Sequence, residues 1–389
     1  MDRLGRARIL GPASWFLLFL MPVACGIALY IFLSDVGVLL SPRGPAVGSY
    51  VRSISPLANL ALPGINPYLP IVDGWIALLL AMIIHEGAHG IVARSRGLPV
   101  KSSGLILFLV VPIGAFVDLD EDAMKVAKAA DSGRVLAAGA GINFVVGLVC
   151  LLLLFGVVST MRPTDNQGLG VVVVQGSPLS NAGVKTYDYI EAVDGIRINS
   201  TSDIASSSWY RIGNVVNVTV WRDGTTFYRN ITIGSQLFQN TTSHQNFTLA
   251  YLGMSNQNTG VGGLQGLIST YTGSLLKTPL LYLCIPTLPN CQQLAPFSDM
   301  MSGFYASYYG SSLIPLANLL YWIFLLNILL AIFNSLPIYP MDGGQAFRVG
   351  VQALGRGKLS EANLTRITLG VTLAVVALLF VAIVGPYFI

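Results

Sequence analysis

Charged residues are scarce in this chain. Of its 389 residues only 10% are Asp, Glu, Lys or Arg, whereas 53% are hydrophobic, and the mean hydropathy is +0.66. This composition excludes an ordinary soluble domain and indicates an integral membrane protein. The net charge is only +4, so it calls for no nucleic-acid partner.

Cysteine and histidine are also rare, with four and three residues respectively. Cys25 and Cys150 fall in apolar runs, where buried free thiols are expected. Cys284 and Cys291, in "CIPTLPNC", either form a small disulfide loop or stay free, because spacing alone does not fix their geometry. With so few histidines, two of them in one apolar run require a chemical reason.

Apolar runs of about 20 residues, the length that crosses a hydrocarbon core of roughly 30 Å, predict the membrane spans. They cover residues 13–33, 71–93, 135–159, 312–337 and 367–388. The first run follows basic residues as a signal peptide does, but its length and the lack of a cleavage site favour a retained helix. We therefore expect a polytopic α-helical membrane protein with about five to six transmembrane helices.

Two weaker apolar segments do not fit a simple span. The run "SGLILFLVVPIGAFV" at 103–117 is short and contains proline and glycine, so we expect a re-entrant or interfacial segment. Residues 264–284 contain Lys277 and several hydroxyl groups and are expected to be amphipathic, although a span is the alternative.

The distribution of Lys and Arg predicts the orientation. With a cytosolic N-terminus, residues 1–12, 94–134 and 338–366 lie inside and hold 13 of the 22 basic residues. This asymmetry follows the positive-inside rule. We therefore expect the N-terminus in the cytosol.

Residues 165–248 break the apolar pattern. Short strand-like runs, "GVVVVQ", "YIEAVDGIRI", "NVVNVTVW" and "FYRNITI", alternate with turns and with two short helical runs, "SPLSNAG" and "TSDIASSSWYR". Five glycosylation sequons begin at Asn199, Asn217, Asn230, Asn240 and Asn246. We expect a small extracytosolic α+β domain here, followed by a connector at 249–311, between membrane regions at 1–160 and 312–389.

The run "LLLAMIIHEGAHGIVARSRG" contains the pattern H-E-x-x-H. Residues four apart share one face of a helix, so His85 and His89 can both ligate one metal ion, with Glu86 near a metal-bound water. In such sites zinc lowers the pKa of its water to about 7 and the glutamate accepts a proton. Ionisable groups are costly inside a membrane, so a catalytic site is favoured over a chance match.

A catalytic zinc usually takes three protein ligands, so a third one is needed. His244 lies among the sequons, which leaves a carboxylate. One candidate is the acidic stretch "DLDED", with Asp118, Asp120, Glu121 and Asp122; the other is Asp342 in "NSLPIYPMDGG". The depth of the histidines, eight and four residues before "ARSRG" or roughly 12 and 6 Å at helical rise, favours Asp342.

Three separated motifs resemble the site-2 proteases, the family of intramembrane zinc metalloproteases: "HEGAH" at 85–89, "NSLPIYPMDGG" at 334–344 and "AAGAGINF" at 137–144. The resemblance implies Zn²⁺ bound by His85, His89 and Asp342, with Glu86 as general base. It also implies that Asn334, and similarly Asn143, help to hold the substrate beside the catalytic site. Ala140 and Met341 depart from the family's usual proline and leucine.

The order "LGVVVV", "SPLSNAG" and "DYIEAVDGIRINSTSDI" resembles the PDZ domains inserted at this place in many site-2 proteases. Such domains add a peptide as a strand and capture its free carboxyl end in backbone N–H groups. Gly168, Gly170 and Val171 would supply that loop, so peptide C-termini are expected partners. The alternative is a spacer without a groove.

The resemblance implies substrates that are single-span membrane proteins in the lipid bilayer. A helix hides its peptide bonds in internal hydrogen bonds, so we expect helix-weakening residues near the cut and a polar water path from the cytosolic side. Pro337 and Pro340 would interrupt the fourth span and expose backbone groups to the unwound substrate. The competing hypothesis is a noncatalytic membrane scaffold or transporter with a structural metal.

Overall fold

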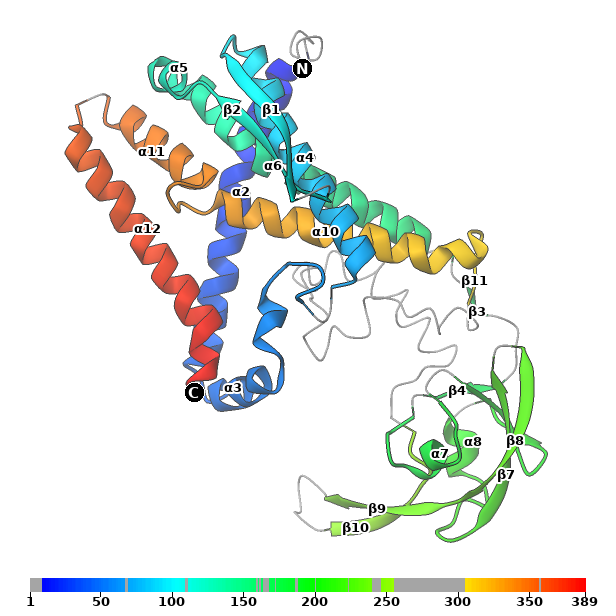
Figure 1. Ribbon diagram of the computed structural model, residues 1–389. Helices are drawn as coiled ribbons and strands as arrows, with labels where there is room; N and C mark the ends of the chain where they lie inside the picture. Colours follow the sequence, from blue (N-terminus) through cyan, green and yellow to red (C-terminus); the bar gives the residue numbers. More distant parts are fainter. Residues whose placement is uncertain are drawn as a thin grey trace. The chain divides into compact units, whose positions relative to one another are not determined.

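The structure is a computed structural model of the chain (Figure 1). It describes residues 9–66, 69–108, 111–158, 160, 162–163, 168–171, 173–185, 188–199, 201–222, 224–239, 246–254, 305–356 and 358–389. Cys284, Cys291, His244, Asn240 and the segment 264–284 lie outside these residues. The chain divides into two compact units, Met1–Leu154 with Asn318–Ile389, here called the membrane unit, and Phe155–Ala317, here called the sheet unit.

Long apolar helices form most of the membrane unit. The α-helices that lie wholly or mainly in it are α2 (Leu10–Leu39), α3 (Gly44–Ser53), α4 (Ile71–Ser95), α5 (Glu121–Val126), α6 (Ala129–Val158), α10 (Leu313–Ser335), α11 (Asp342–Leu354) and α12 (Glu361–Val384). Five stretches are long and apolar enough to cross a membrane: Leu10–Leu39, Ile71–Ser95, Ala129–Val157, Gly310–Ser335 and Glu361–Tyr387. They overlap the five predicted runs and agree with a multi-pass membrane protein.

The apolar side chains of these helices are often exposed. Phe19 on α2 and Phe380 on α12 are 65% and 62% exposed, and both lie on helices whose apolar residues are mostly at the surface. A soluble monomer rarely exposes apolar surface of this extent, whereas a lipid environment solvates it. The exposed faces therefore fit contact with hydrocarbon.

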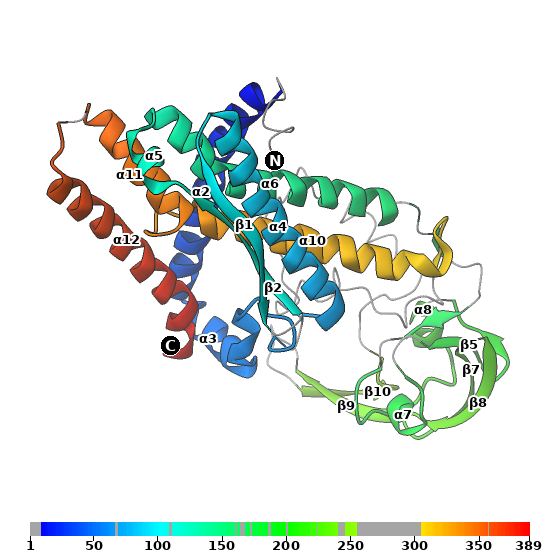
Figure 2. The same cartoon turned by 45° about the horizontal axis from the view of Figure 1, so that its top comes forward.

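The segment predicted to be re-entrant or interfacial has the form of a β-hairpin. Strands β1 (Val100–Phe108) and β2 (Val111–Leu119) pair in antiparallel fashion, with Ser103 opposite Val117. Its Val, Ile, Leu and Phe residues favour strands, and the register shifts between Ile106 and Leu107, opposite the Gly114–Pro112 stretch of β2. Strand β2 packs along α4, and both views show the hairpin beside that helix (Figure 2). Its depth in a membrane stays a prediction.

Small residues allow α6 to pack closely against its neighbours. A Cβ atom on Gly141 would lie 2.8 Å from a side-chain atom of Leu17 on α2, and one on Gly147 would lie 2.7 Å from Ile328 on α10. Glycines at such positions let helix backbones approach, which is how helices associate in membranes. Helix α6 is therefore the central helix against which α2 and α10 pack.

The sheet unit is rich in strands. They are β3 (Arg162–Pro163), β4 (Leu169–Gly170), β5 (Tyr189–Val193), β6 (Ile196–Arg197), β7 (Val215–Arg222), β8 (Thr225–Thr232), β9 (Gly234–Gln239), β10 (Asn246–Tyr251) and β11 (Tyr305–Ala306), with short helices α7 (Pro178–Asn181) and α8 (Thr201–Ala205). Strands β4, β5, β7 and β8 form one sheet in that order, and β6 pairs with β5. The sheet covers an apolar core that includes Leu179, Ile190 and Val218.

The predicted turns of this unit are present. Asp194 and Gly195 both have positive φ, 49° and 79°, in the two-residue connection between β5 and β6, as a type I′ hairpin requires. Gly224, with φ +82°, lies in the turn between β7 and β8. The run "GVVVVQ" contributes only the end of β4 and an isolated bridge from Val173 to Met254.

A buried arginine joins α6 to α2. The Arg134 guanidinium donates from Nε to Ser14 Oγ at 3.0 Å, and from Nη2 to the same oxygen at 2.8 Å and to the Gly11 carbonyl at 2.9 Å. Its Nη1 donates to Asp131 Oδ1 at 3.3 Å, and the guanidinium carbon lies 4.8 Å from the centre of the Trp15 ring. The Arg134 guanidinium therefore makes all of these polar contacts.

Arg134→Met should therefore destabilise the membrane unit by about 3 kcal/mol, because it leaves the buried Ser14 hydroxyl without its donor and Asp131 with only the longer ion pair to Arg96 at 3.9 Å. The matched control is Arg348→Met, which breaks the Arg348–Glu361 ion pair (2.6 Å), whose carboxylate is largely exposed, and should cost about 1 kcal/mol or less. Unfolding in detergent micelles, followed by circular dichroism, measures both. Equal losses of stability in Arg134→Met and Arg348→Met would contradict the structural role of the buried Arg134.

Candidate metal centre

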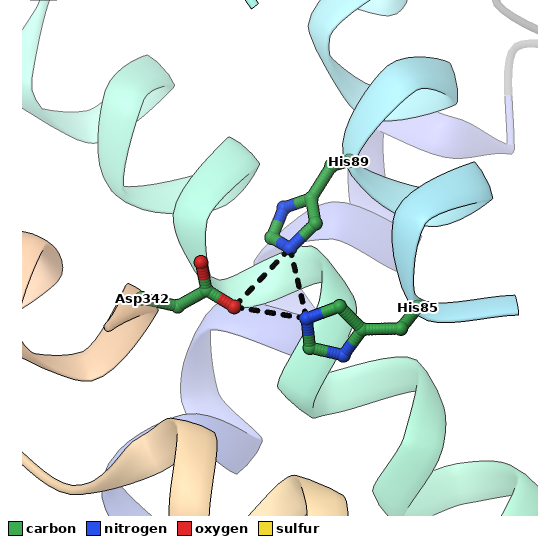
Figure 3. A group of neighbouring side chains, drawn as sticks. All are labelled: His85, His89 and Asp342. Atoms are coloured by element: carbon green, nitrogen blue, oxygen red, sulfur yellow. Dashed lines mark hydrogen bonds and ion pairs between the residues drawn. The ribbon is translucent and has the colours of Figure 1, made fainter. Parts of the chain in front are cut away.

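Three ligand-type side chains converge in the membrane unit (Figure 3). His85 and His89 lie one turn apart on α4, each 5% exposed, and Asp342 is the first residue of α11. Asp342 Oδ2 lies 3.0 Å from His85 Nε2 and 3.2 Å from His89 Nε2, and the two Nε2 atoms are 3.2 Å apart. Among the described residues, these form the one group of three or more His, Cys, Asp or Glu whose ligand atoms lie close together.

The turn after α10 delivers Asp342 to the histidines. Gly343 and Gly344 pack against the backbone of that turn, since a Cβ atom would lie 2.3 Å from the Leu336 carbonyl oxygen at Gly343 and 2.4 Å from Ile338 at Gly344. Thr372 Oγ1 on α12 accepts the Tyr339 N–H at 3.0 Å. Any residue with a side chain would force the turn to shift, so only glycine fits at these two positions. The "DGG" sequence therefore allows α11 to start directly beside the site.

Pro337 and Pro340 lie in this turn, two and five residues after the end of α10 at Ser335. The Pro337 carbonyl accepts a hydrogen bond from Thr372 Oγ1 at 3.4 Å, and the Pro340 carbonyl accepts one from Gln345 Nε2 at 2.8 Å. Both prolines thus end the helix rather than interrupt it, and both carbonyls have partners. A role in pairing with substrate stays a prediction.

The Nε2 atoms of both histidines and Oδ2 of Asp342 point at one another. His89 Nδ1 lies 2.7 Å from the Val135 carbonyl oxygen, so Nδ1 carries a proton, and a neutral ring then has its lone pair on Nε2. Three lone-pair atoms about 3 Å apart repel unless a cation or a proton lies among them. Tetrahedral zinc with bonds of 2.0–2.1 Å separates its ligands by about 3.3 Å. The donor set and its distances therefore fit zinc.

Gly139 on α6 provides the space next to these nitrogens. A Cβ atom at this position would lie 2.4 Å from His89 Nε2 and 2.5 Å from His85 Nε2. Only a residue without a side chain fits here. The motif "AAGAGINF" predicted no role for this glycine, because the reason for it lies on another helix.

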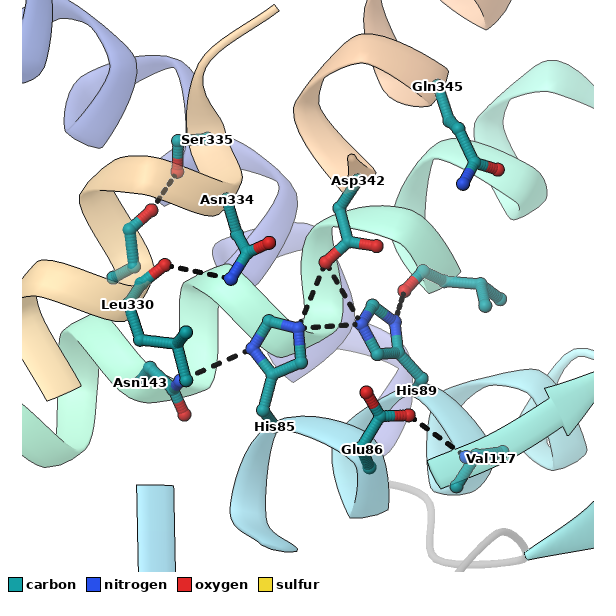
Figure 4. A network of polar contacts seen from close by, with 12 residues as sticks. His85, Glu86, His89, Val117, Asn143, Leu330, Asn334, Ser335, Asp342 and Gln345 are labelled. Carbon is teal, nitrogen blue, oxygen red and sulfur yellow. Dashed lines mark hydrogen bonds and ion pairs between the residues drawn. The ribbon is translucent and has the colours of Figure 1, made fainter. Parts of the chain in front are cut away.

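Glu86 lies on α4 between the two histidines and is half-buried. Its Oε2 accepts the backbone N–H of Val117, on β2, at 3.0 Å (Figure 4). The candidate base therefore lies next to the three ligands and contacts the hairpin.

Asn143 and Asn334 also reach this region (Figure 4). Asn143 is fully buried on α6, with Nδ2 placed 3.2 Å from His85 Nδ1 and its Oδ1 without a partner. A metal on His85 Nε2 would require a proton on Nδ1, and an amide rotated by 180° would then present Oδ1 to that proton. Asn334 Nδ2 donates to the Leu330 carbonyl at 3.0 Å.

The acidic stretch that competed with Asp342 has other contacts. Asp120 Oδ1 caps α5 by accepting the N–H groups of Asp122 and Ala123. The Ala123 N–H is the main cause that lowers the pKa of Asp120. Asp122 pairs with Lys125 at 3.1 Å. The structure brings Asp342, and none of these residues, to the histidines.

The other predicted site residues lie in the sheet unit. Gly168 packs against β5, because a Cβ atom would lie 2.6 Å from the Ile190 carbonyl oxygen, and Gly170 pairs with Tyr189. The Val171 N–H donates to the Asp188 carbonyl at 3.0 Å. Val171 therefore has no free N–H for a carboxylate in this structure, and the loop would have to open at that residue. Of the cysteines in the described residues, Cys25 and Cys150 are free thiols; Cys150 is buried as expected, whereas Cys25 is only half-buried.

Comparison with known proteins places these motifs in context. A model of peptidase family M50 matches residues 74–379. An uncharacterized protein of Methanocaldococcus jannaschii is 38% identical over 135 residues, which are 35% of this chain and 35% of that protein. The regulator of sigma-W protease RasP of Bacillus subtilis is 28% identical over 228 residues, 58% of this chain and 51% of RasP.

A membrane-bound transcription factor site-2 protease homolog of Arabidopsis thaliana is 25% identical over 158 residues, 40% of this chain and 29% of that protein. The chain thus spans between 29% and 51% of the length of these three relatives. The family match includes His85, His89, Asn143 and Asp342.

Gly139→Ala should abolish metal binding, because the added methyl group would occupy the space beside both Nε2 atoms. We expect at least a tenfold loss of affinity, comparable to losses from altered metal surroundings, measured by inductively coupled plasma mass spectrometry after dialysis against zinc buffers. Gly133→Ala, on the same helix, is the control, because its Cβ atom would meet only Leu18 at 3.6 Å. Equal metal content in Gly139→Ala and Gly133→Ala would contradict the role of Gly139 in leaving space for the metal.

Proposed function

The chain belongs to peptidase family M50, the site-2 protease family, and on this basis we propose that it is an intramembrane zinc-dependent endopeptidase. It would hydrolyse peptide bonds within or near membrane-spanning segments of other proteins. The observation that carries the proposal is the convergence of His85, His89 and Asp342 beside Glu86. Three protein ligands leave a fourth position open, as catalytic zinc sites do and closed structural sites do not.

His85 and His89 would bind Zn²⁺ through Nε2, and Asp342 through Oδ2. Bound zinc would supply a water of lowered pKa and polarise the substrate carbonyl. Glu86 would accept the proton of the attacking water and pass it to the leaving amine. The Val135 carbonyl holds the tautomer of His89 in which Nε2 can ligate.

Asn334 and Asn143 would hold the substrate beside the metal. The Asn143 Oδ1 atom is buried without a partner, and Asn334 donates from Nδ2 to a carbonyl of its own helix. Each amide therefore has hydrogen-bonding capacity left for a peptide or for an imidazole. Pro337 and Pro340 would shape the turn against which an unwound substrate lies.

The substrates would be single-span membrane proteins with helix-weakening residues near the cut, reached by water from the cytosolic side. The N-terminus would be cytosolic, and residues 165–248 would form an extracytosolic PDZ-like domain that takes peptide C-termini through Gly168 and Gly170. Membrane regions at 1–160 and 312–389, and a connector at 249–311, would complete the organisation.

Glu86→Gln should keep zinc and lower cleavage by about a thousandfold, within the usual range for loss of a general base. Asp342→Ala should lose both, because two histidines do not hold a catalytic zinc. The measurement is cleavage of a panel of single-span polypeptides in liposomes, with bound zinc quantified for each variant. Asp122→Ala, in the acidic stretch, is the control and should keep both properties.

Three results would contradict the proposal. If wild type binds zinc but cuts no member of a broad panel, a noncatalytic scaffold or transporter is favoured. If Glu86→Gln still cleaves, Glu86 is not the base. If Asp342→Ala keeps its zinc while variants of the acidic stretch lose it, the third ligand lies at 118–122.

A further inference from the structure

The carboxylate of Glu86 contacts an element outside the three catalytic motifs. The hydrogen-bond donor that the structure gives it is the Val117 N–H, 3.0 Å from Oε2, on strand β2 of the hairpin (Figure 4). Val117 lies 31 residues from Glu86 in the sequence. The contact is therefore a product of the fold.

The register of the hairpin explains why this N–H is available. In an antiparallel pair, alternate residues direct both their N–H and their C=O to the partner strand, and the residues between them direct both away. Val117 is opposite Ser103, and its N–H points to α4 instead of β1. The backbone N–H and C=O groups of Phe116 and Asp118 are then directed at β1, whereas those of Ala115 are directed outward like those of Val117. In the part of the chain that the structure describes, this sheet has two strands, and no other strand pairs with the outward edge of β2.

Several contacts fix Val117 relative to α4. Leu119 and Val100, at the open end of the hairpin, pack against the apolar cluster around Val92 and Ala93 on α4. The Asp120 N–H donates to the Pro99 carbonyl at 3.3 Å, and Arg94 Nη2 donates to the Val100 carbonyl at 3.0 Å. Helix α4 therefore carries Glu86 and also holds the strand that carries Val117, so it fixes both partners of the Val117–Glu86 hydrogen bond.

The side chains of β1 toward the tip of the hairpin are exposed. Leu105, Ile106 and Leu107, toward its tip, are 51%, 46% and 56% exposed. The bond to Glu86 thus comes from the anchored half of the hairpin, two residues from Leu119. A half-buried carboxylate beside two buried imidazoles needs a fixed donor, because it has lost part of its water.

We propose that Val117 is a positioning residue, whose backbone N–H orients the Glu86 carboxylate for proton transfer. The β-hairpin then acts as a support for the general base. This role rests on the proposed function, because it requires that Glu86 be the base. It involves no contact of Val117 with the metal or the substrate.

Val117→Pro removes this N–H without removing a bond between β1 and β2, and proline is tolerated on an edge strand. We expect kcat to fall about tenfold to a hundredfold, which corresponds to the loss of a hydrogen bond to a charged group, with unchanged KM and bound zinc. Ala115→Pro is the matched control, since it removes the next outward N–H on the same strand and should leave kcat unchanged. Cleavage of a single-span reporter by the full-length protein in liposomes gives kcat and KM for both variants. Bound zinc is quantified in the same preparations.

A second variant keeps the proposal testable if Val117→Pro does not fold. Replacing the Val117 amide by an ester, by nonsense suppression with the α-hydroxy acid, exchanges only the N–H for oxygen and should lower kcat likewise. A reading independent of activity is hydrogen exchange: Glu86→Ala should speed exchange of the Val117 amide at least tenfold and leave that of Phe116 unchanged.

The outcomes separate cleanly. Wild-type kcat in Val117→Pro and in the ester variant overturns the proposal, as do equal losses in Val117→Pro and Ala115→Pro, which would indicate a general effect on the strand. Exchange of Val117 that is unaffected by Glu86→Ala overturns it as well. If wild type cleaves nothing while Glu86→Ala still speeds the exchange, the hydrogen bond exists but the proposed function fails, and the positioning role fails with it.

Discussion

The site depends on one electrostatic constraint, the convergence of three lone-pair atoms in a poorly hydrated interior. Two imidazole nitrogens and a carboxylate oxygen lie 3.0–3.2 Å from one another. Without a positive charge among them this arrangement is unfavourable, and burial removes the water that would screen the repulsion. A cation or a proton among these atoms would remove the repulsion, and the proposed Zn²⁺ would therefore stabilise the fold as well as serve the chemistry. The neighbouring features follow from it: the Val135 carbonyl sets a tautomer, and Gly139 leaves the space open.

This constraint joins distant parts of the chain. The histidines come from one helix, but Asp342 arrives 253 residues after His89 through a tight turn. Gly343 and Gly344 let α11 begin against that turn, and Thr372 fixes it from α12. The precision of the third ligand is therefore a property of α10, α11 and α12 together. Changes at Thr372 on α12 would reach Asp342 through the same contacts.

Periodicity and motif spacing predicted part of this arrangement. The apolar runs gave the five long helices, because a hydrocarbon core sets a minimum length, and His85 and His89 share a face because they are four apart. The third ligand had two candidates, since pairing across 253 residues leaves no local signal. The hairpin was expected only as a re-entrant or interfacial segment, because a short apolar run with β-branched residues is ambiguous between helix and strand. Gly139 was missed because its reason is the shape of another helix.

The same reasoning explains why the base contacts a strand. The interior of a membrane helix satisfies its own backbone groups, so the middle of α4 has no N–H left for the Glu86 side chain. An unpaired strand edge is the element that presents free backbone donors in a row, and it is safe from aggregation only where something covers it. Placing β2 along α4 meets both requirements, since the helix covers the edge and one outward N–H meets the carboxylate. The β-hairpin thus supplies to Glu86, the proposed base, a backbone donor that the interior of α4 cannot supply.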